Sequence, residues 1–189
     1  MLYSELQCSD AIHKAVERMG FAEMTEIQEK TIPVMMAGYD VIAKAPTGTG
    51  KTCAFGIPVA EHILPENKYP QAVIMAPTRE LAQQIAEELT ELTYFMPEVQ
   101  VACVYGGANM EKQAKRLAEG CQIVVATPGR LMDHYKHHSI DISHVTQIVL
   151  DEADEMLNMG FYKDVRHIIE MMKARKSLSM FSALSLIHI

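Results

Sequence analysis

The 189-residue chain lacks the features that mark membrane and secreted proteins. It has no run of about 18 apolar residues, roughly the shortest helix that spans a bilayer, so we expect no membrane segment. Its start, MLYSELQCSD, contains no basic stretch followed by an apolar block, so no signal peptide is predicted. The expected location is therefore cytoplasmic.

Cysteine and positive charge are also scarce. Cys8, Cys53, Cys103 and Cys121 do not have the spacing of metal ligands, so we expect reduced, structural thiols. Cys53 lies at a predicted helix start, where the pKa of a thiol can fall and open it to alkylation. The net charge of −7 argues against a surface that coats nucleic acid in general, although it permits a local basic groove.

Repeats, low-complexity tracts and an inter-domain linker are absent as well, so the length fits a single domain, which we expect to be a monomer. His134, His137 and His138 could share a face and bind a metal. We favour an exposed helix end for these histidines, because cationic side chains stabilise helix C-termini.

The best-defined pattern that is present is APTGTGKT, at Ala45–Thr52. It has the spacing of a phosphate-binding loop, in which glycines let backbone N–H groups converge on phosphate oxygens. The apolar run Asp40–Ala45 predicts a buried strand before it. Lys51 can reach the β- and γ-phosphates, and the Thr52 hydroxyl can ligate Mg²⁺. The predicted phosphate-loop residues are Ala45, Pro46, Thr47, Gly48, Thr49, Gly50, Lys51 and Thr52.

A second pattern is DEAD, at Asp151–Asp154, which ends the apolar run Gln147–Asp151. A carboxylate at the end of a strand beside a phosphate loop is where nucleotide hydrolases hold Mg²⁺. We assign Asp151 to Mg²⁺, through water, and Glu152 to orienting or deprotonating the attacking water. With Lys51, these two acids form the predicted catalytic set. The two patterns together predict an ATPase site.

Three further motifs each follow a strand-like run: PTRELA at Pro77–Ala82, the pair Gly106-Gly107, and TPGR at Thr127–Arg130. Because parallel strands end at one edge of a sheet, we expect all three motifs at the same edge. Arg79 and Arg130 can pair with phosphates there. Such contacts fix the position of a nucleic acid without reading its bases.

In this order, the motifs resemble those of the DEAD-box RNA helicases, from Tyr3 to Ala183. The resemblance implies a RecA-like P-loop domain, an α/β fold with a parallel sheet between helices. It implies ATP and Mg²⁺ as cofactors, and RNA as the partner, with ATP hydrolysis coupled to duplex unwinding in a full-length protein. The implied RNA contacts are Pro77, Thr78, Arg79, Gly106, Gly107, Thr127, Pro128, Gly129 and Arg130.

The segment GFAEMTEIQ, Gly20–Gln28, is similar to the family's Q motif, which selects adenine. The Gln28 amide can donate and accept, so it can read both the amino group and a ring nitrogen of adenine. Phe21 offers an aromatic face near the base, and Thr25 fits the motif. Met24 replaces the usual proline, and Tyr3 stands where the family usually has phenylalanine.

Residues 1–183 would form the first, ATP-binding domain, with the Q motif within residues 1–28, and the family's second helicase domain is absent from this sequence. The family's Ser-Ala-Thr motif couples ATP chemistry to RNA binding. Ser182 and Ala183 fit it, whereas Leu184 stands in place of threonine. Asp154 is assigned as an organiser of polar contacts that takes part in this coupling. We interpret residues 184–189 as a foreign or misread tail in preference to a natural truncation.

The order of elements predicts two N-terminal helices followed by alternating strands and helices, hence a parallel sheet. The seam between the N-terminal helices and the phosphate loop should hold adenine. Pro58 is expected to kink or end its helix. Helices are predicted at Ser9–Met19, Thr25–Ala37, Cys53–Ile63, Arg79–Phe95, Asn109–Ala118 and Phe161–Lys173, and further strands at Ala72–Ala76, Val99–Tyr105 and Gln122–Ala126.

Two other functions stay open at this point. A related DNA helicase could share the same core, although the adenine motif at Gln28 and the PTRELA and TPGR motifs weigh against it. A nucleotide-gated RNA-binding or partner-docking module without turnover is the second alternative. We expect this chain to bind nucleotide but to hydrolyse it very slowly, because in the family the second domain supplies the arginine fingers.

Overall fold

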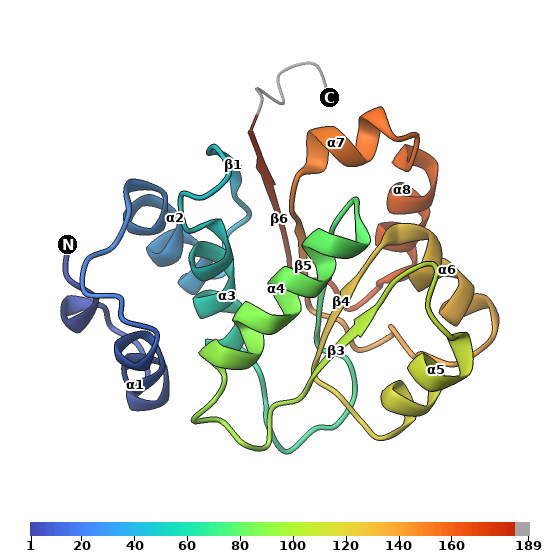
Figure 1. Cartoon of the computed structure of the whole chain (residues 1–189), viewed down its shortest axis with the longest axis horizontal. Coiled ribbons are helices and arrows are strands. Elements are labelled where there is room, and N and C mark those ends of the chain that lie inside the picture. The colour runs from blue at the N-terminus through green and yellow to red at the C-terminus, as the bar shows by residue number, and fades with distance from the viewer. Residues whose placement is uncertain (184–189) are drawn as a thin grey trace.

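The computed structural model describes residues 1–183, in which a six-stranded sheet lies between two layers of helices (Figure 1). The strand order is β1-β6-β5-β2-β4-β3, and every neighbouring pair is parallel. The predicted α/β architecture is therefore confirmed. The tail from Leu184 lies outside the described residues.

All the predicted elements are present, with ends that differ by a few residues from those expected. The strands are β1 (Ile42–Lys44), β2 (Ala72–Met75), β3 (Val101–Val104), β4 (Ile123–Ala126), β5 (Gln147–Leu150) and β6 (Ser177–Ser182). The helices are α1 (Asp10–Arg18), α2 (Glu26–Met36), α3 (Lys51–Glu61), α4 (Arg79–Leu92), α5 (Met110–Ala118), α6 (Pro128–Lys136), α7 (Ala153–Asn158) and α8 (Tyr162–Met171), with a 3-10 turn at Tyr3–Glu5.

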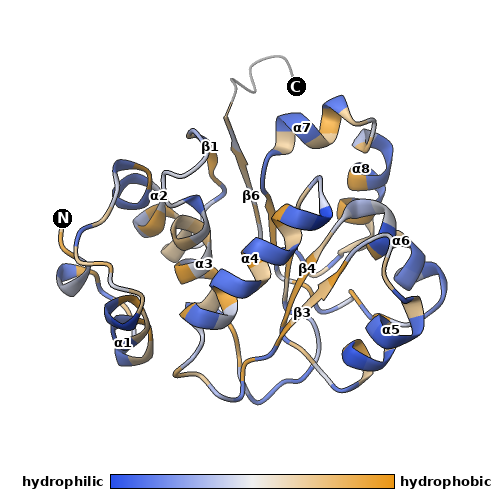
Figure 2. Ribbon diagram, in the orientation of Figure 1, coloured by the Kyte–Doolittle hydropathy of each residue, from blue (hydrophilic) through white to orange (hydrophobic). Residues whose placement is uncertain are grey.

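Alternate residues of the central strands face opposite layers. In β2, Ile74 belongs to the apolar core shared with α3 and α4, whereas Val73 and Met75 belong to the core shared with α6 and α8. Strands β3 and β4 are apolar, whereas the helices carry polar residues on their outer surfaces (Figure 2). Because both faces of the sheet are covered, its central strands appear in the sequence as continuous apolar runs.

The strand before the phosphate loop differs from the prediction of a buried strand. Ile42 is 72% exposed, Lys44 is exposed, and only Ala43 between them is buried. Within residues 1–183, β1 pairs with β6 alone, so it forms an edge of the sheet. An apolar run cannot distinguish a strand with one neighbour from a strand with two, which is why the expectation was wrong.

The expected early end at Pro58 is also wrong, because α3 continues past it to Glu61. Every residue of α3 from Cys53 to Ala60 is buried, against α2 on one side and α4 on the other. A proline within a helix costs about 3 kcal/mol, which burial of several apolar side chains offsets. Tertiary packing therefore determines the length of this helix.

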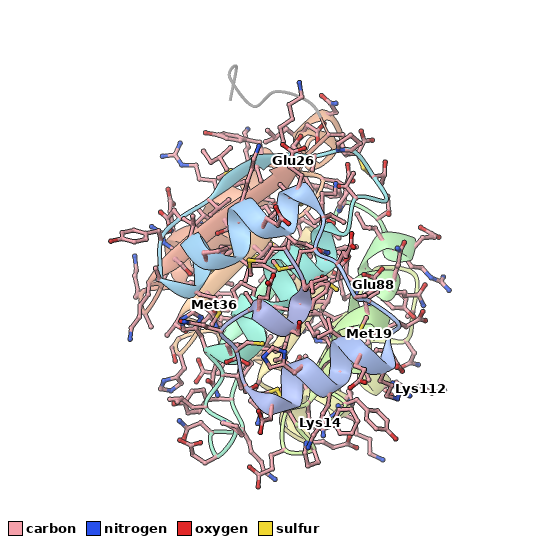
Figure 3. The ribbon with its side chains drawn as sticks, turned by 90° about the vertical axis from the view of Figure 1, so that its left-hand side faces the viewer. Lys14, Met19, Glu26, Met36, Glu88 and Lys112 are labelled. Atoms are coloured by element: carbon pink, nitrogen blue, oxygen red, sulfur yellow. The ribbon has the colours of Figure 1, made fainter. Side chains whose placement is uncertain are left out.

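The N-terminal helices form an additional layer over α3 (Figure 3). The Ser9 hydroxyl caps α1 by accepting from the Ile12 backbone N–H. Gly38, with φ of 83°, follows the end of α2 and turns the chain toward β1. This layer leaves a seam between α1, α2 and the loop that precedes α3.

The loops that follow β1, β2, β3, β4 and β5 carry the predicted motifs, and all of them leave the same edge of the sheet (Figure 1). Sites in parallel α/β sheets form at this carboxyl edge. No helix within residues 1–183 combines the length and the apolar character needed to cross a membrane.

Candidate functional site

The phosphate loop turns between β1 and α3 through glycines in the left-handed conformation. Gly48 has φ of 78° and Gly50 has φ of 79°, a region that is strained for residues with a side chain. A Cβ atom on Gly50 would lie 2.3 Å from Nε2 of Gln28, so this position also needs a close approach that glycine alone permits. Since α3 begins at Lys51, its unpaired N-terminal N–H groups lie at the end of the loop, where an anion is stabilised.

The start of the phosphate loop is joined to the end of β6. The backbone N–H of buried Ala45 donates to the Ser182 carbonyl at 2.9 Å. The Thr49 hydroxyl donates to the Pro46 carbonyl at 2.7 Å, which closes the turn, and Thr47 is exposed beside it. The predicted coupling residue Ser182 therefore bonds directly to the phosphate loop through its backbone.

Lys51 lies between the two acids that were assigned to catalysis. Its Nζ atom is 2.7 Å from Oε1 of Glu152 and 3.5 Å from Oδ1 of Asp151. The lysine side chain is 6% exposed and that of Asp151 is 3% exposed. These groups come from the start of α3 and the end of β5, with β6 between the two phosphate-site strands. The fold thus brings together residues that lie a hundred positions apart.

Burial of the Asp151 carboxyl group disfavours its ionised form. Burial raises its pKa from 3.8 to about 6, while the nearby Lys51 ammonium opposes that rise and Glu152 adds to it. A bound divalent cation would stabilise the ionised form of such a carboxylate. The partly buried Thr52 hydroxyl, one residue after Lys51, is the second predicted ligand for that cation.

Glu152 has a strained backbone at the start of α7. Its φ of 51° places a residue with a side chain in the left-handed region, and its N–H donates to Oδ1 of Asp151 at 3.0 Å. Strain of this kind costs about 1–3 kcal/mol and is concentrated at functional sites. It directs the Glu152 side chain to Lys51.

Gln28 is buried, and its amide bonds to three protein groups. Its Oε1 atom accepts from the Tyr3 hydroxyl at 2.7 Å and from the Thr25 backbone N–H at 2.9 Å. Its Nε2 atom donates to the Gly50 carbonyl at 3.0 Å. The Thr25 hydroxyl donates to the Thr49 carbonyl at 2.8 Å. The Q-motif residues are therefore bonded to the phosphate loop.

Tyr3 makes a hydrogen bond to Gln28 that the sequence did not indicate. Tyr3 is buried, and its hydroxyl makes the bond to Gln28 that a phenylalanine could not make. Its ring lies 6.4 Å from that of Phe21, nearly parallel to it. Phe21 is 44% exposed and lines the cavity described next.

A cavity of about 500 Å³ connects these groups. The Q-motif residues line one end and Lys51, Asp151 and Glu152 the other. Residues at the end of α1 and on α4 that the sequence does not predict also line it, among them Met19 and Glu88, which are labelled in Figure 3. The predicted seam is thus hollow and continuous with the phosphate loop.

The PTRELA motif lies at the junction of β2 and α4. Pro77 is buried, and the Thr78 hydroxyl caps α4 by accepting from the Leu81 N–H at 3.3 Å. Arg79 is exposed, with its guanidinium carbon 5.1 Å from the centre of the Tyr105 ring. This distance is that of a cation–π contact, which holds the charged group at the surface.

The TPGR motif begins α6, with Thr127 as N-cap and Pro128 in the first turn. Gly129 is half-buried, and the Arg130 side chain is only 13% exposed. Its Nη1 atom donates to the Ala108 carbonyl and to Oε1 of Gln113, both at 3.0 Å. Arg130 therefore contacts the turn that contains the exposed pair Gly106-Gly107.

Comparison with known proteins identifies the family. The DEAD/DEAH box helicase family matches residues 25–184. The chain belongs to the DEAD/DEAH box helicases. It is 50% identical to the ATP-dependent RNA helicase CshA of Limosilactobacillus reuteri, over 97% of this chain and 37% of that protein. It is 43% identical to the ATP-dependent RNA helicase DeaD of Mycobacterium tuberculosis, over 96% of this chain and 32% of that protein.

Solved structures agree with this assignment. A DEAD box protein from the hyperthermophile Methanococcus jannaschii superposes with a TM-score of 0.90 at 40% identity, over 98% of this chain and 50% of that one. A hypothetical ATP-dependent RNA helicase from Sulfolobus tokodaii gives 0.84 at 39% identity, over 93% of this chain and 51% of that one. The fold is thus the RecA-like DEAD-box domain, and the chain spans about a third of the curated relatives it matches.

In this DEAD-box domain, the last acid of the DEAD motif is held differently from the first two. Oδ1 of Asp154 is buried and makes no hydrogen bond within residues 1–183. Asp154 lies in the first turn of α7, beside the strained Glu152. A buried carboxylate oxygen without a donor is costly, and at this oxygen the described residues show none of the polar contacts that Asp154 is predicted to organise, so that role stays a prediction.

The structural role expected for the Cys53 thiol agrees with its burial, whereas the lowered pKa considered for it is wrong. Its thiol is buried, and burial raises its pKa to about 12. The positive end of α3 does not dominate, because desolvation of the thiolate in an apolar core is the larger effect. This DEAD-box domain therefore has no activated thiol at Cys53.

The histidine cluster also differs from the exposed helix end that was expected. His137 and His138 are exposed just after α6, whereas His134 is fully buried. Nε2 of His134 lies 3.1 Å from Oε1 of Gln113. Burial, followed by the charge of Arg130, lowers the pKa of His134. This inward-facing position could not be predicted locally, because His134 is polar and lies within four residues of two exposed histidines.

Proposed function

We propose that this chain is the ATP-binding domain of a DEAD-box RNA helicase, which binds ATP with Mg²⁺ and the backbone of single-stranded RNA. One observation carries the proposal: a single cavity joins the Gln28 amide at one end to Lys51, Asp151 and Glu152 at the other. In the full-length protein, ATP hydrolysis at this site would be coupled to separation of an RNA duplex.

Adenine would be recognised by Gln28 within this cavity. The second N–H of Nε2 is left for a ring nitrogen of the base, since the first donates to Gly50. Oε1 already accepts from Tyr3 and Thr25, so the amino group of adenine would replace or share one of these donors. Guanine presents a carbonyl oxygen where adenine has that amino group, so Oε1 would meet an acceptor.

The chain's residues fit a magnesium ion beside the phosphates. Asp151, whose burial favours a cationic partner, and the Thr52 hydroxyl would hold it. When bound, Mg²⁺ would neutralise charge that develops on the phosphate oxygens. Lys51 would move from its acidic partners to the phosphates, which leaves Glu152 free to orient the attacking water.

RNA would bind across the loops that follow β2, β3 and β4. Arg79 and Arg130 supply positive charge, and the exposed backbone at Gly106 and Gly107 permits close approach. The DNA helicase alternative is separated by comparing oligouridine with oligodeoxythymidine of the same length. Equal affinity for both would reject RNA as the preferred partner.

The alternative of a docking module without turnover is tested on the same chain, which spans about a third of the length of its curated relatives. We expect the isolated chain to bind nucleotide, to turn over ATP negligibly with or without RNA, and to separate no duplex. Adding a second helicase domain from a relative such as CshA should restore turnover. Continued lack of turnover in that mixture, with nucleotide still bound, would favour the docking module.

A further inference from the structure

The loops that follow β2, β3 and β4 carry the proposed RNA contacts and are called the RNA edge. Two residues outside the motifs connect these three loops. Tyr105 directly follows β3 and precedes Gly106, and Gln113 lies on α5, where it is buried. Neither residue contacts the nucleotide cavity, whose lining includes neither of them. A buried polar side chain such as Gln113 rigidifies its surroundings when all of its hydrogen bonds are satisfied.

The Gln113 amide has one orientation that satisfies all of its neighbours. Its Nε2 atom donates to the Tyr105 carbonyl at 3.1 Å. Its Oε1 atom accepts from Nη1 of Arg130 at 3.0 Å and lies 3.1 Å from Nε2 of His134. A flipped amide would place its NH₂ group against the Arg130 donor and its oxygen against the Tyr105 carbonyl. Since Nη1 of Arg130 also donates to Ala108, the glycine turn and α6 are joined.

Tyr105 extends the same connection to the PTRELA motif. Its hydroxyl accepts from Nε2 of Gln83 on α4 at 3.0 Å, and its ring lies under the Arg79 guanidinium. Its carbonyl is the group that Gln113 holds. One tyrosine therefore contacts α4 through its ring and hydroxyl, and α5 through its backbone.

The Arg130 guanidinium still has an N–H group in this arrangement that could donate to an anion. Its Nε atom is buried without a hydrogen bond inside the described chain, and Oδ2 of Asp133, an exposed side chain, lies 3.9 Å away. The partners of Nη1 are neutral carbonyl oxygens. A phosphate oxygen at hydrogen-bonding distance would add a closer charged partner than the Asp133 carboxylate.

We propose that Tyr105 and Gln113 are positioning residues for RNA, which hold Arg79, the Gly106–Ala108 turn and Arg130 in one preformed arrangement. This inference rests on the proposed binding of RNA. Preformed contacts avoid the cost of ordering side chains and loops when a ligand binds. The arrangement explains how an acidic chain can present a local surface for the phosphate backbone.

The first test does not require RNA. Hydrogen exchange of the backbone at residues 105–109 is measured in the wild type, in Gln113→Leu and in Gln7→Leu, the same change at an exposed residue. Gln113→Leu should accelerate exchange about 10-fold, because the Tyr105 carbonyl loses its donor and Arg130 loses a partner. Gln7→Leu should have no effect. Unchanged exchange in Gln113→Leu would overturn the proposal.

The second test measures binding of a short oligouridine, with Mg-ADP affinity as the check on folding. Gln113→Leu should weaken RNA binding about 10-fold and leave Mg-ADP binding unchanged. Gln113→Glu should recover part of the loss, because a carboxylate still accepts from Arg130 but cannot donate to Tyr105. Tyr105→Leu should weaken RNA binding by a similar factor.

A double-mutant cycle separates positioning from a general structural role. If Gln113 acts through Arg130, Gln113→Leu should add little to the loss caused by Arg130→Met. Fully additive losses would overturn the proposal. A wild-type chain that binds no oligouridine would reject the proposed RNA function, and hydrogen exchange would still decide whether Gln113 holds the turn.

Discussion

The proposed nucleotide site and the proposed RNA edge are built in different ways, although both lie at the carboxyl ends of the strands of the same sheet. In the nucleotide site, the motif residues contact one another, and Lys51 is bonded to the acids of the DEAD motif. At the RNA edge, the motif residues contact residues outside the motifs, as Arg130 contacts Gln113. In the first site, the Lys51 ammonium contacts two carboxylates of the DEAD motif. In the second, the arginines contact uncharged side chains, Gln113 on α5 and Tyr105 directly after β3.

This difference means that substitutions in the two regions should fail in different ways. A change in the nucleotide site should alter charge balance and ligand binding directly. A change at the RNA edge should first alter the geometry of a loop. Substitutions in the nucleotide half should therefore change ligand binding or stability while the RNA edge serves as an internal reference.

The largest effect is expected for Lys51→Ala. It removes the cation that would bind the phosphates and leaves the buried Asp151 without its charged partner. Mg-ADP affinity should fall about 100-fold, the scale of a lost charge-assisted contact. Calorimetric titration measures this. Lys44→Ala, at an exposed lysine on the adjoining strand, is the control and should bind as the wild type does.

The RNA edge should not respond to Lys51→Ala. Hydrogen exchange at Gly106–Ala108 should match the wild type, because no bond joins this turn to Lys51 within the described residues. Faster exchange there would show that the two regions are coupled, which would contradict the difference proposed between them.

Gly50→Ala should be the next most damaging change. It combines a left-handed φ with a Cβ 2.3 Å from Nε2 of Gln28. The matched control is Gly38→Ala, where φ is 83° and no atom lies within 4 Å of the new Cβ. Gly38→Ala should lose about 1 kcal/mol of unfolding free energy from backbone strain, and Gly50→Ala about 1–3 kcal/mol more from the clash. Urea unfolding compares them, and equal losses would mean that Gln28 moves aside freely.

Asp151 should make the nucleotide-free chain less stable as pH rises from about 4 to about 6, since its pKa rises from 3.8 to about 6 on folding. In that window the folded state keeps a proton that the unfolded state has released, so deprotonation favours unfolding. The stability of the wild type should fall relative to Asp151→Asn by up to about 1.4 kcal/mol per pH unit, with no further change above the folded pKa. Parallel pH profiles for the two proteins would contradict the burial argument.

The smallest effect is expected for Tyr3→Phe, which removes only the hydroxyl that donates to Gln28. Oε1 of Gln28 still accepts from the Thr25 N–H, so the amide stays oriented. The unfolding free energy should fall by about 1 kcal/mol. Mg-ADP affinity should change little, because the substitution also frees an acceptor site for adenine. A loss as large as that of Lys51→Ala would show that Tyr3, not Gln28, controls the site.

The same contrast explains what the sequence could reveal. The phosphate loop and the DEAD motif were found because their chemistry depends on residues at fixed short spacing, and apolar runs placed both at strand ends. The supports of the RNA edge were not found, because Gln113 and Tyr105 meet Arg130 and Arg79 only after α5, α6 and β3 have packed. Local pattern likewise could not show that β1 lies at an edge or that His134 faces inward.

The central claim is that residues 1–183 already contain a complete adenine-selective pocket. Calorimetric titration with Mg-ADP and Mg-GDP, for the wild type and for Gln28→Ala, tests it most directly. Our account predicts that the wild type binds Mg-ADP and not Mg-GDP, and that Gln28→Ala weakens Mg-ADP binding about 10-fold. Equal binding of both nucleotides by the wild type, unchanged in Gln28→Ala, would contradict it.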